Sequence, residues 1–366
     1  MPPIGFGGIF FLARWFGLIF VRWCAFLVLL PCAAVAQGFA NLGTDASGFA
    51  VPERGHVLEF PIDHGPHEDF RIEWWYLTAN LETADGTPYG LQWTLFRTAL
   101  TPDGGSGWST PQLWMGHAAV TTPDAHYSGE RLARGGIGQA GVVVDKDFTA
   151  WIDDWQMTGS QDLAKLELNA KGDVFAYDMA LQAQGPLVLQ GDKGFSVKSG
   201  EGQASYYYSQ PFYEIKGTLA LPDGEIPVSG QAWLDREWSS QPLSNDQTGW
   251  DWFSLSFETG ERMMGFVLRS QDGVANYTSA TWIEADGKAT PMPNGSFSAV
   301  SLAESEVADR RVPTRWRLEL PEKNLSVIVS ALNIDSWMKT SIPYWEGPIN
   351  IEGSHAGRGY LEMTGY

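Results

Sequence analysis

The sequence has little cysteine and little positive charge, and each shortage excludes a class of protein. Of its 366 residues only two are cysteines, Cys24 and Cys32, and both lie in the first 36 residues. The rest of the chain therefore has no disulfide, thiol nucleophile or zinc–thiolate site. Basic residues number 24 against 43 acidic residues, for a formal charge of −19. That charge repels nucleic acid and anionic membrane surfaces, so a nucleic-acid role is excluded.

The chemical signatures of several enzyme classes are also missing. The sequence contains no GxSxG nucleophile motif, phosphate loop, dinucleotide fingerprint or HExxH pattern. It has only six histidines, of which His64 and His67 are the one close pair. A metal pair is the weaker interpretation of these two, because no cysteine can complete the ligand set. We therefore expect no metal, no cofactor and no hydrolase nucleophile.

The first 36 residues predict a signal peptide. Arg14 and Arg22 precede an apolar run, residues 23–35, which ends in a small-x-small pattern at Ala36. An uncleaved anchor is the alternative, but Arg22 leaves fewer than the ~20 apolar residues that a span needs. We predict cleavage near Ala36, a periplasmic or secreted location, and a mature chain without a stable transmembrane span. Residues 37–55 are small and polar and predict a flexible lead-in.

Beyond the lead-in, the hydrophobic pattern predicts a nearly all-β protein. Most readable segments alternate with period two and end at Gly, Pro, Asn or Asp, as antiparallel strands do. The clearest segments are 148–155, 163–169, 175–182, 213–221, 315–320 and 325–329. Turn signals separate them at Asp85-Gly86, Lys171-Gly172, Asp223-Gly224, Asp272-Gly273 and Asp286-Gly287. Short strands at regular spacing favour barrels or sandwiches.

A weak internal repeat divides the chain into two related halves. Aligning Glu82 with Glu258 places Trp74 opposite Trp250 and Tyr76 opposite Trp252. Each half then closes with an aromatic–Glu strand, FYEIKG in the first and YWEG in the second. We therefore predict two β domains, residues 56–230 and 231–366, with a boundary near Gly230.

Both halves combine acidic residues with tryptophan, which predicts one wide apolar ligand site with a few polar groups. A carboxylic acid in such a site stays protonated because desolvation raises its pKa, and aromatic faces can stabilise a cation. Asp235, between Trp233 and Trp238, is the candidate acid, and Glu73 is its counterpart in the first half. The other candidates are the orienting pair Arg236 and Glu237, His64 and His67 as water-positioning residues beside Asp63, and the walls Trp74, Tyr76, Trp238, Trp250 and Trp252.

Each candidate also has a structural interpretation. Asp235-Arg236-Glu237 can equally be a buried salt-bridge cluster, and Glu73 can form an ion pair with Arg71 or Arg97. His117 lies on an otherwise apolar strand, where a hydrogen-bonded core histidine is the commoner outcome; we retain it as a weaker ligand-binding candidate.

Four motifs in order resemble those of secreted members of the carotenoid-hydratase-like family. They are DHGPH…EWWY, WLDREWSSQPL, GWDWFSL and YWEGPINIEGSHAGRGYLEMTGY, and the resemblance covers roughly residues 55–366. It implies two tandem lipocalin-like antiparallel β-barrels. It also implies hydro-lyase activity, since founding members add water to a terminal C=C of acyclic carotenoids, and fungal relatives include hydratases and pericyclases acting on apolar polyketides. Many secreted members are known only as hydrolase-like or binding proteins.

One departure from the family pattern affects the proposed chemistry. Carotenoid hydratases typically have Asp-His-Asn where this chain has Asp235-Arg236-Glu237. A permanently charged arginine replaces a histidine that can exchange protons. The hypothesis is thus an exported protein that binds a small polyene or lipid-like molecule, with hydratase-type chemistry as an extension. The alternative is a non-catalytic periplasmic binding protein that serves an envelope transport system.

Overall fold

The structure is a computed structural model that describes residues 40, 42 and 46–366. The predicted signal peptide lies outside the described residues. Residues 46–55, which the sequence predicts to be a flexible lead-in, are hydrogen-bonded to the rest of the chain. Ala50 N–H donates to Asp69 O at 2.9 Å, and Glu53 N–H donates to the Tyr206 hydroxyl oxygen at 2.7 Å. This part of the lead-in is therefore fixed against the first sheet.

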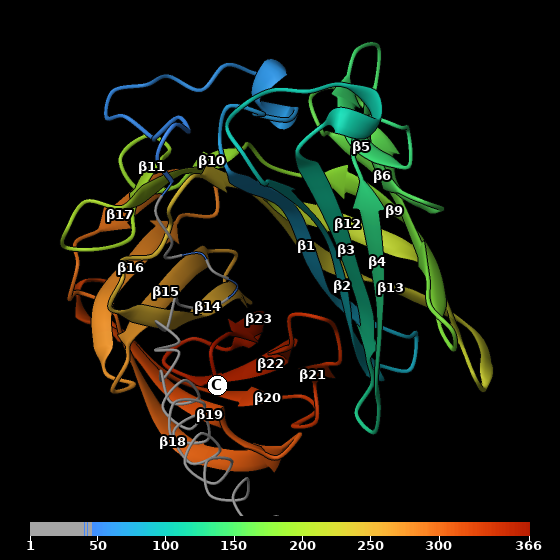
Figure 1. The fold of residues 1–366 in the computed structure, drawn as a ribbon. Helices are drawn as coiled ribbons and strands as arrows, with labels where there is room; N and C mark the ends of the chain where they lie inside the picture. The colour runs from blue at the N-terminus through green and yellow to red at the C-terminus, as the bar shows by residue number, and fades with distance from the viewer. Residues whose placement is uncertain (1–39, 41, 43–45) are drawn as a thin grey trace, which may run out of the picture. The chain divides into compact units, whose positions relative to one another are not determined.

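Among the described residues, nearly all regular structure is β, which confirms the predicted fold class. Within the described residues the first sheet has thirteen strands, ordered β4-β3-β2-β1-β13-β12-β9-β8-β7-β6-β5, with β10 and β11 paired to β12. Figure 1 shows β1, β2, β3 and β4 of this sheet side by side. Its strands are β1 (Ile72–Glu82), β2 (Pro88–Ala99), β3 (Gln112–Thr121), β4 (His126–Arg134), β5 (Ala140–Val144), β6 (Phe148–Ile152), β7 (Trp155–Gly159), β8 (Lys165–Lys171), β9 (Ala176–Ala183), β10 (Val188–Leu189), β11 (Phe195–Val197), β12 (Ala204–Leu221) and β13 (Gly224–Ser239). Short 3₁₀ turns occur at Ile62–His64, Gly107–Ser109 and Pro321–Lys323.

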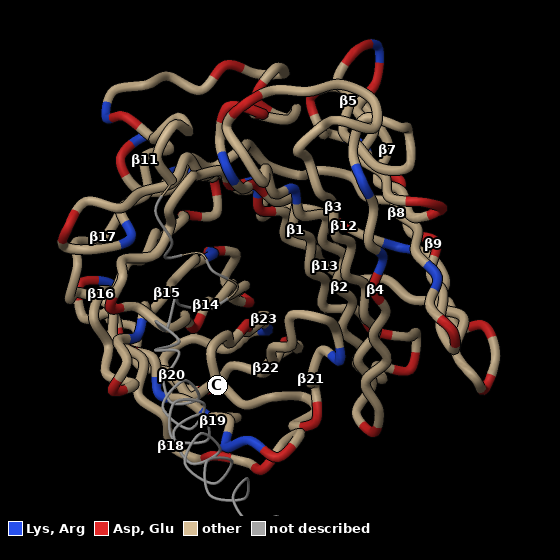
Figure 2. Tube along the Cα trace, viewed as in Figure 1, with Lys and Arg blue, Asp and Glu red and all other residues tan. Residues whose placement is uncertain are grey.

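The second sheet has ten strands within the described residues, ordered β17-β16-β15-β14-β23-β22-β20-β19-β18, with β21 paired to β22. Its strands are β14 (Gln247–Phe257), β15 (Arg262–Ser270), β16 (Ala275–Ile283), β17 (Ala289–Met292), β18 (Ser298–Val307), β19 (Arg310–Leu320), β20 (Leu325–Ala331), β21 (Trp337–Met338), β22 (Tyr344–Gly353) and β23 (Gly357–Met363). All pairings are antiparallel, and the five predicted turn signals each join neighbouring strands. Acidic residues occupy many of these hairpin turns (Figure 2).

Each sheet curls around a core of its own, as in a lipocalin-like unit. In the first, Gly116 of β3 lies against Ile152 of β6, so strands from opposite ends of the sheet meet. In the second, the rings of Phe253 on β14 and Trp316 on β19 have centroids 5.8 Å apart. A third cluster of buried side chains joins the outer faces of the two sheets, with Tyr76 and Trp233 from the first and Trp252 and Phe266 from the second.

Two predicted boundaries need correction. Residues 148–155 form the two strands β6 and β7, because Asp153, at φ +51°, turns the chain between them. Gly230 lies in the middle of β13, where it pairs with Leu81 and Ile215. A Cβ there would come within 2.0 Å of Asn80 O, so this glycine permits close approach of two backbones. The chain passes from the first sheet to the second between Ser239 and Gln247.

The two sheets repeat the same strand order, which extends the predicted repeat. The series β2-β1-β13-β12 in the first corresponds to β15-β14-β23-β22 in the second. Trp74 and Tyr76 on β1 match Trp250 and Trp252 on β14, as the sequence alignment predicts. In each series a strand late in the chain pairs with the first one, β13 with β1 and β23 with β14, so β23 is the counterpart of β13.

Candidate functional site

A cavity of about 160 Å³ lies between the two sheets, several times the space that one water molecule needs. Its wall is largely apolar and aromatic with a few acidic groups. From the first sheet it includes Trp74, Tyr76, Phe96, His117, Tyr207, Asp235 and Glu237, and from the second Trp250, Trp252, Phe266, Leu268, Tyr344 and Glu362. Aromatic walls with a small number of polar groups are typical of small-molecule sites.

Strand alternation explains how β1 and β13 supply the wall. Side chains two residues apart share one face of a strand, and cross-strand partners share that face as well. Trp74 pairs with Glu237, and Tyr76 pairs with Asp235, so all four side chains lie on the face toward the second sheet. The intervening residues Trp75 and Arg236 point to the other face, into the first unit.

Asp235 is a buried carboxyl whose hydrogen-bond donors are neutral side chains. Tyr207 O–H donates to Oδ2 at 2.5 Å, while Ser209 O–H and Trp233 Nε1–H donate to Oδ1 at 2.5 and 2.6 Å. Burial raises the pKa of Asp235 to about 7, because the three neutral donors only partly offset desolvation and the Glu237 charge raises it further. The acid and its ionised form are therefore both available near neutral pH.

Glu362 on β23 is a second acid of the same kind, and it is not among the residues predicted from the sequence. Glu362 pairs with Trp252 as Asp235 pairs with Tyr76, so the two acids occupy equivalent positions in the repeat. Trp250 Nε1–H donates to Glu362 Oε1 at 2.5 Å. Burial raises the pKa of Glu362 to about 7, partly opposed by the Trp250 hydrogen bond and reinforced by the charges of Asp235 and Glu237.

The signal for Glu362 was present in the repeat, in the final segment GYLEMTGY. It could not be used from sequence alone, because the residue opposite Trp252 depends on which distant strand pairs with β14. Glu346 on β22, the cross-strand partner of Glu362, is a further buried acid that accepts a hydrogen bond from Tyr76 O–H. Burial and the charge of Glu362 raise the pKa of Glu346 well above its usual value.

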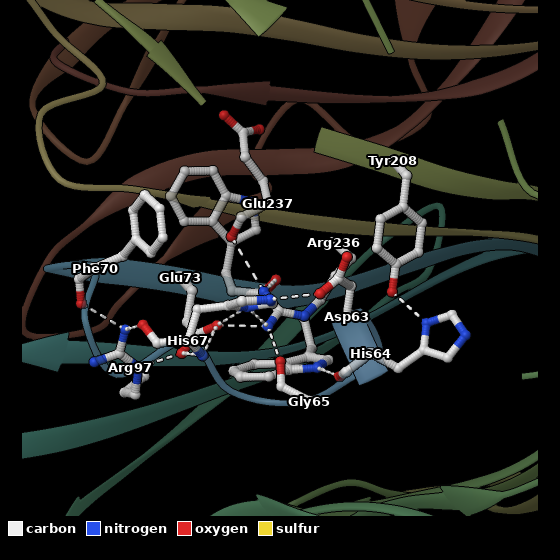
Figure 3. A network of polar contacts seen from close by, with 12 residues as sticks. Asp63, His64, Gly65, His67, Phe70, Glu73, Arg97, Tyr208, Arg236 and Glu237 are labelled. Atoms are coloured by element: carbon white, nitrogen blue, oxygen red, sulfur yellow. Dashed lines mark hydrogen bonds and ion pairs between the residues drawn. The ribbon is translucent and has the colours of Figure 1, made fainter. Parts of the chain in front are cut away.

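Glu73 has the opposite environment, which favours the ion-pair alternative (Figure 3). Its carboxylate accepts hydrogen bonds from Arg97 Nε and Arg236 Nη2, and all three side chains are buried. Burial alone would raise the pKa of Glu73, but the Arg236 and Arg97 charges and the His67 hydrogen bond outweigh it and hold this pKa well below its usual range. Glu73 is thus a permanent anion that cannot serve as a proton donor near neutral pH.

The Arg236–Glu237 pair predicted from sequence does not exist as a side-chain pair. Arg236 stacks on Trp75, with the guanidinium carbon 3.7 Å from the ring centroid, and donates to Gly65 O. Glu237 lies on the opposite face of β13 and pairs with Lys198, Nζ to Oε1, at 2.8 Å. Adjacent strand residues cannot share a face. The arginine that departs from the family pattern therefore lies away from the cavity wall.

Three other predicted ligand-site residues also lie away from the cavity. Trp238 is in a separate buried cluster with Tyr206 and Tyr208 and stacks on His67 at 4.0 Å between ring centroids. His67 contacts Glu73 and Asp63. His64 Nδ1 lies 2.5 Å from the Tyr208 hydroxyl, and burial lowers its pKa to about 4. These three residues lie around Arg236, where β1 begins and β13 ends. Together with Glu73, Arg97 and Arg236 they form what we call the Arg236 network.

His117 lines the cavity and is hydrogen-bonded on both ring nitrogens. Nδ1 lies 3.0 Å from the Tyr344 hydroxyl and Nε2 lies 3.2 Å from Glu130 Oε1. Burial lowers the pKa of His117, against the opposing effect of Glu130. Its position joins β3 of the first sheet to β22 of the second.

Over the described part of the chain, no group of three or more His, Cys, Asp or Glu residues is arranged to hold a metal ion. Among those same residues, no helix has the length and apolar character needed to cross a membrane.

The fold and cavity define a class: a protein of two lipocalin-like β units with an aromatic, acid-bearing cavity between them. The sequence model of the AttH-like family matches residues 51–366, and the chain belongs to that family. A crystal structure of an AttH-type protein from Nitrosomonas europaea is 34% identical, with a TM-score of 0.78, over 87% of this chain and 99% of that one. This agrees with the family resemblance carried by the four motifs.

Two more distant structures share the fold. Kievitone hydratase from Nectria haematococca is 15% identical, with a TM-score of 0.61, over 87% of this chain and 98% of that one. CghA is 13% identical, with a TM-score of 0.52, over 90% of this chain and 97% of that one. No protein with a curated description matches the chain.

Proposed function

We propose that the protein binds a small, largely hydrophobic molecule in the cavity between its sheets and acts on it as a hydro-lyase. One observation carries this proposal. Asp235 and Glu362 occupy equivalent positions in the two halves, both line an aromatic cavity, and both have a pKa of about 7. At neutral pH one can carry a proton while the other is ionised, as acid–base catalysis requires. The hydratase named among the structural neighbours has this fold, which agrees with the proposal.

The chemistry can be followed from the residues. Protonated Asp235 transfers its proton to the less substituted carbon of a trisubstituted C=C, which leaves a tertiary cation. The faces of Trp74, Trp250 and Trp252 stabilise that cation. Water in the cavity adds through oxygen to the cation, and ionised Glu362 accepts the proton that the water loses. Dehydration follows the same path in reverse.

The leader sequence supports export, so we place this activity in the periplasm or outside the cell. The test uses purified protein incubated in D₂O with geraniol, farnesol and lycopene, followed by mass spectrometry. We expect one added water, with deuterium on carbon, for at least one of the three alkenes. The rate should be highest near pH 7 and fall on both sides, because the reaction needs one acid protonated and the other ionised.

Asp235→Asn should reduce the rate at least about 100-fold, since it removes the proton donor. Asp223→Asn, in the exposed turn between β12 and β13, is the matched control and should keep full activity. If no alkene reacts with either the native protein or Asp235→Asn, and both bind the alkenes equally well, the protein is a non-catalytic binding protein.

A further inference from the structure

The cavity wall contains an ion pair that the proposed reaction does not use. Lys198 follows β11 and reaches Glu237 of β13, with Nζ 2.8 Å from Oε1, and both side chains are less than 10% exposed. Lys198 Nζ also lies 4.9 Å from the Tyr207 ring centroid and 4.4 Å from that of Phe266. Its backbone is held on both sides, because its N–H donates to Gln203 O and its carbonyl accepts from Gln247 Nε2. The ammonium position is therefore built into the fold.

An ammonium group beside a carboxylate can both donate to and accept from one hydroxyl group. The ammonium has three N–H donors, and the carboxylate accepts at two oxygens. A hydroxyl group placed against the pair would accept from Lys198 and donate to Glu237. An ether would lose the second bond, and a hydrocarbon would lose both.

The charges around the pair disfavour an anionic ligand. Asp235, Glu237 and Glu362 line the same cavity as Lys198. Glu73 also lines it and is shared by Arg97 and Arg236, so the four acids outnumber the three cations. The charges of Asp235 and Glu237 already oppose ionisation of Glu362. A ligand carboxylate would meet the same repulsion, whereas a neutral hydroxyl would not.

We propose that Lys198 and Glu237 form a hydroxyl-binding subsite, so that the ligand is an uncharged, mostly apolar alcohol or phenol. This inference rests on the proposed function of the cavity. Glu237 and Asp235 are two residues apart on one face of β13, a separation of about 7 Å. The hydroxyl of a substrate would therefore lie about that distance from the double bond that Asp235 protonates.

The test uses three ten-carbon probes that share one skeleton: geraniol, geranyl methyl ether and geranic acid at pH 8. Each displaces N-phenyl-1-naphthylamine, a neutral dye that fluoresces in apolar surroundings. Geraniol should bind about ten-fold more tightly than the ether or the acid, because only it makes both charge-assisted hydrogen bonds without adding an anion.

The variant Lys198→Met/Glu237→Gln removes both charges without leaving either one buried alone. It should bring geraniol to within about two-fold of the ether and leave dye binding intact. The matched control is Lys323→Met/Glu284→Gln, which removes a surface pair of similar length, 2.7 Å, and should keep the ten-fold preference.

The outcomes separate the two proposals. Dye binding together with equal affinity for geraniol and geranic acid in the native protein would overturn the hydroxyl subsite and leave the cavity function standing. A preference for geraniol that survives in the double variant would do the same. If the dye does not bind at all, the cavity is not a ligand site and both proposals fail.

Discussion

At the scale of single residues, burial acts differently on two acids that the sequence places in similar surroundings. Asp235 and Glu73 are both buried beside tryptophan. Asp235 has three neutral donors, and its pKa rises to about 7, whereas the two guanidinium groups beside Glu73 lower its pKa. Environments that separate pKa values in this way assign an acid role to one carboxyl and a structural role to the other. The sequence could not separate them, because their partners lie on distant strands.

The raised pKa of Asp235 predicts a specific dependence of stability on pH. The folded protein binds this proton more tightly than the unfolded chain, so the contribution of Asp235 is most favourable below about pH 4. This stabilisation decreases as the pH rises from about 4 to 7, and the free energy of unfolding does not change further with this group above about pH 7. The side chain in Asp235→Asn is neutral, like the protonated acid, so the stability of this variant should not decrease over the same pH range. Its free energy of unfolding should therefore exceed that of the native protein by up to roughly 4 kcal/mol at pH 8.

Urea unfolding at pH 4, 6 and 8 would measure this difference, with Asp223→Asn as the control that shows none. A native protein that is more stable than Asp235→Asn at pH 8 would mean that the charged carboxylate has a stabilising partner.

At the scale of the strand, alternation determines which predictions hold. The placement of Trp74, Tyr76, Trp250 and Trp252 in one wall could be predicted because it needs only period two and the repeat. The grouping of Asp235, Arg236 and Glu237 could not hold, because neighbours on one strand face opposite ways. Trp238 lies on the same face of β13 as Arg236. His67 and His64 contact that face, through Trp238 and Tyr208. Glu362 was missed because strand order, unlike alternation, depends on contacts far apart in sequence.

The Arg236 network, at the start of β1 and the end of β13, should be important for stability. Glu73→Gln would leave Arg97 and Arg236 buried beside each other without their shared anion (Figure 3). We expect a loss of about 3–5 kcal/mol in the free energy of unfolding, measured with urea at pH 7. Glu304→Gln breaks an exposed pair with Arg311 and should cost less than about 1 kcal/mol. Equal, small losses for both variants would show that the buried network contributes little.

At the scale of the whole molecule, the two sheets are joined by buried polar contacts as well as by apolar packing. Tyr76 O–H donates to Glu346, Trp252 Nε1–H donates to Tyr207 Oη at 3.1 Å, and His117 contacts Tyr344. Each contact joins one sheet to the other and lies at or near the cavity. The geometry of the two acids therefore depends on how closely the sheets approach each other.

A substitution at Gly90 can change the distance between the two sheets without altering any residue of the cavity wall. It lies on β2, and a Cβ there would come within 2.6 Å of Pro348 Cδ and Cγ on β22 and 3.1 Å from the Tyr360 hydroxyl. Gly90→Val should therefore force the sheets apart, at a cost of about 1–3 kcal/mol in the free energy of unfolding. It should also weaken N-phenyl-1-naphthylamine binding, because the wall residues of the two sheets separate. Gly104→Val, at a position with open space, should change neither quantity. If Gly90→Val retains both native stability and native dye affinity, close contact between the sheets is not what holds the cavity together.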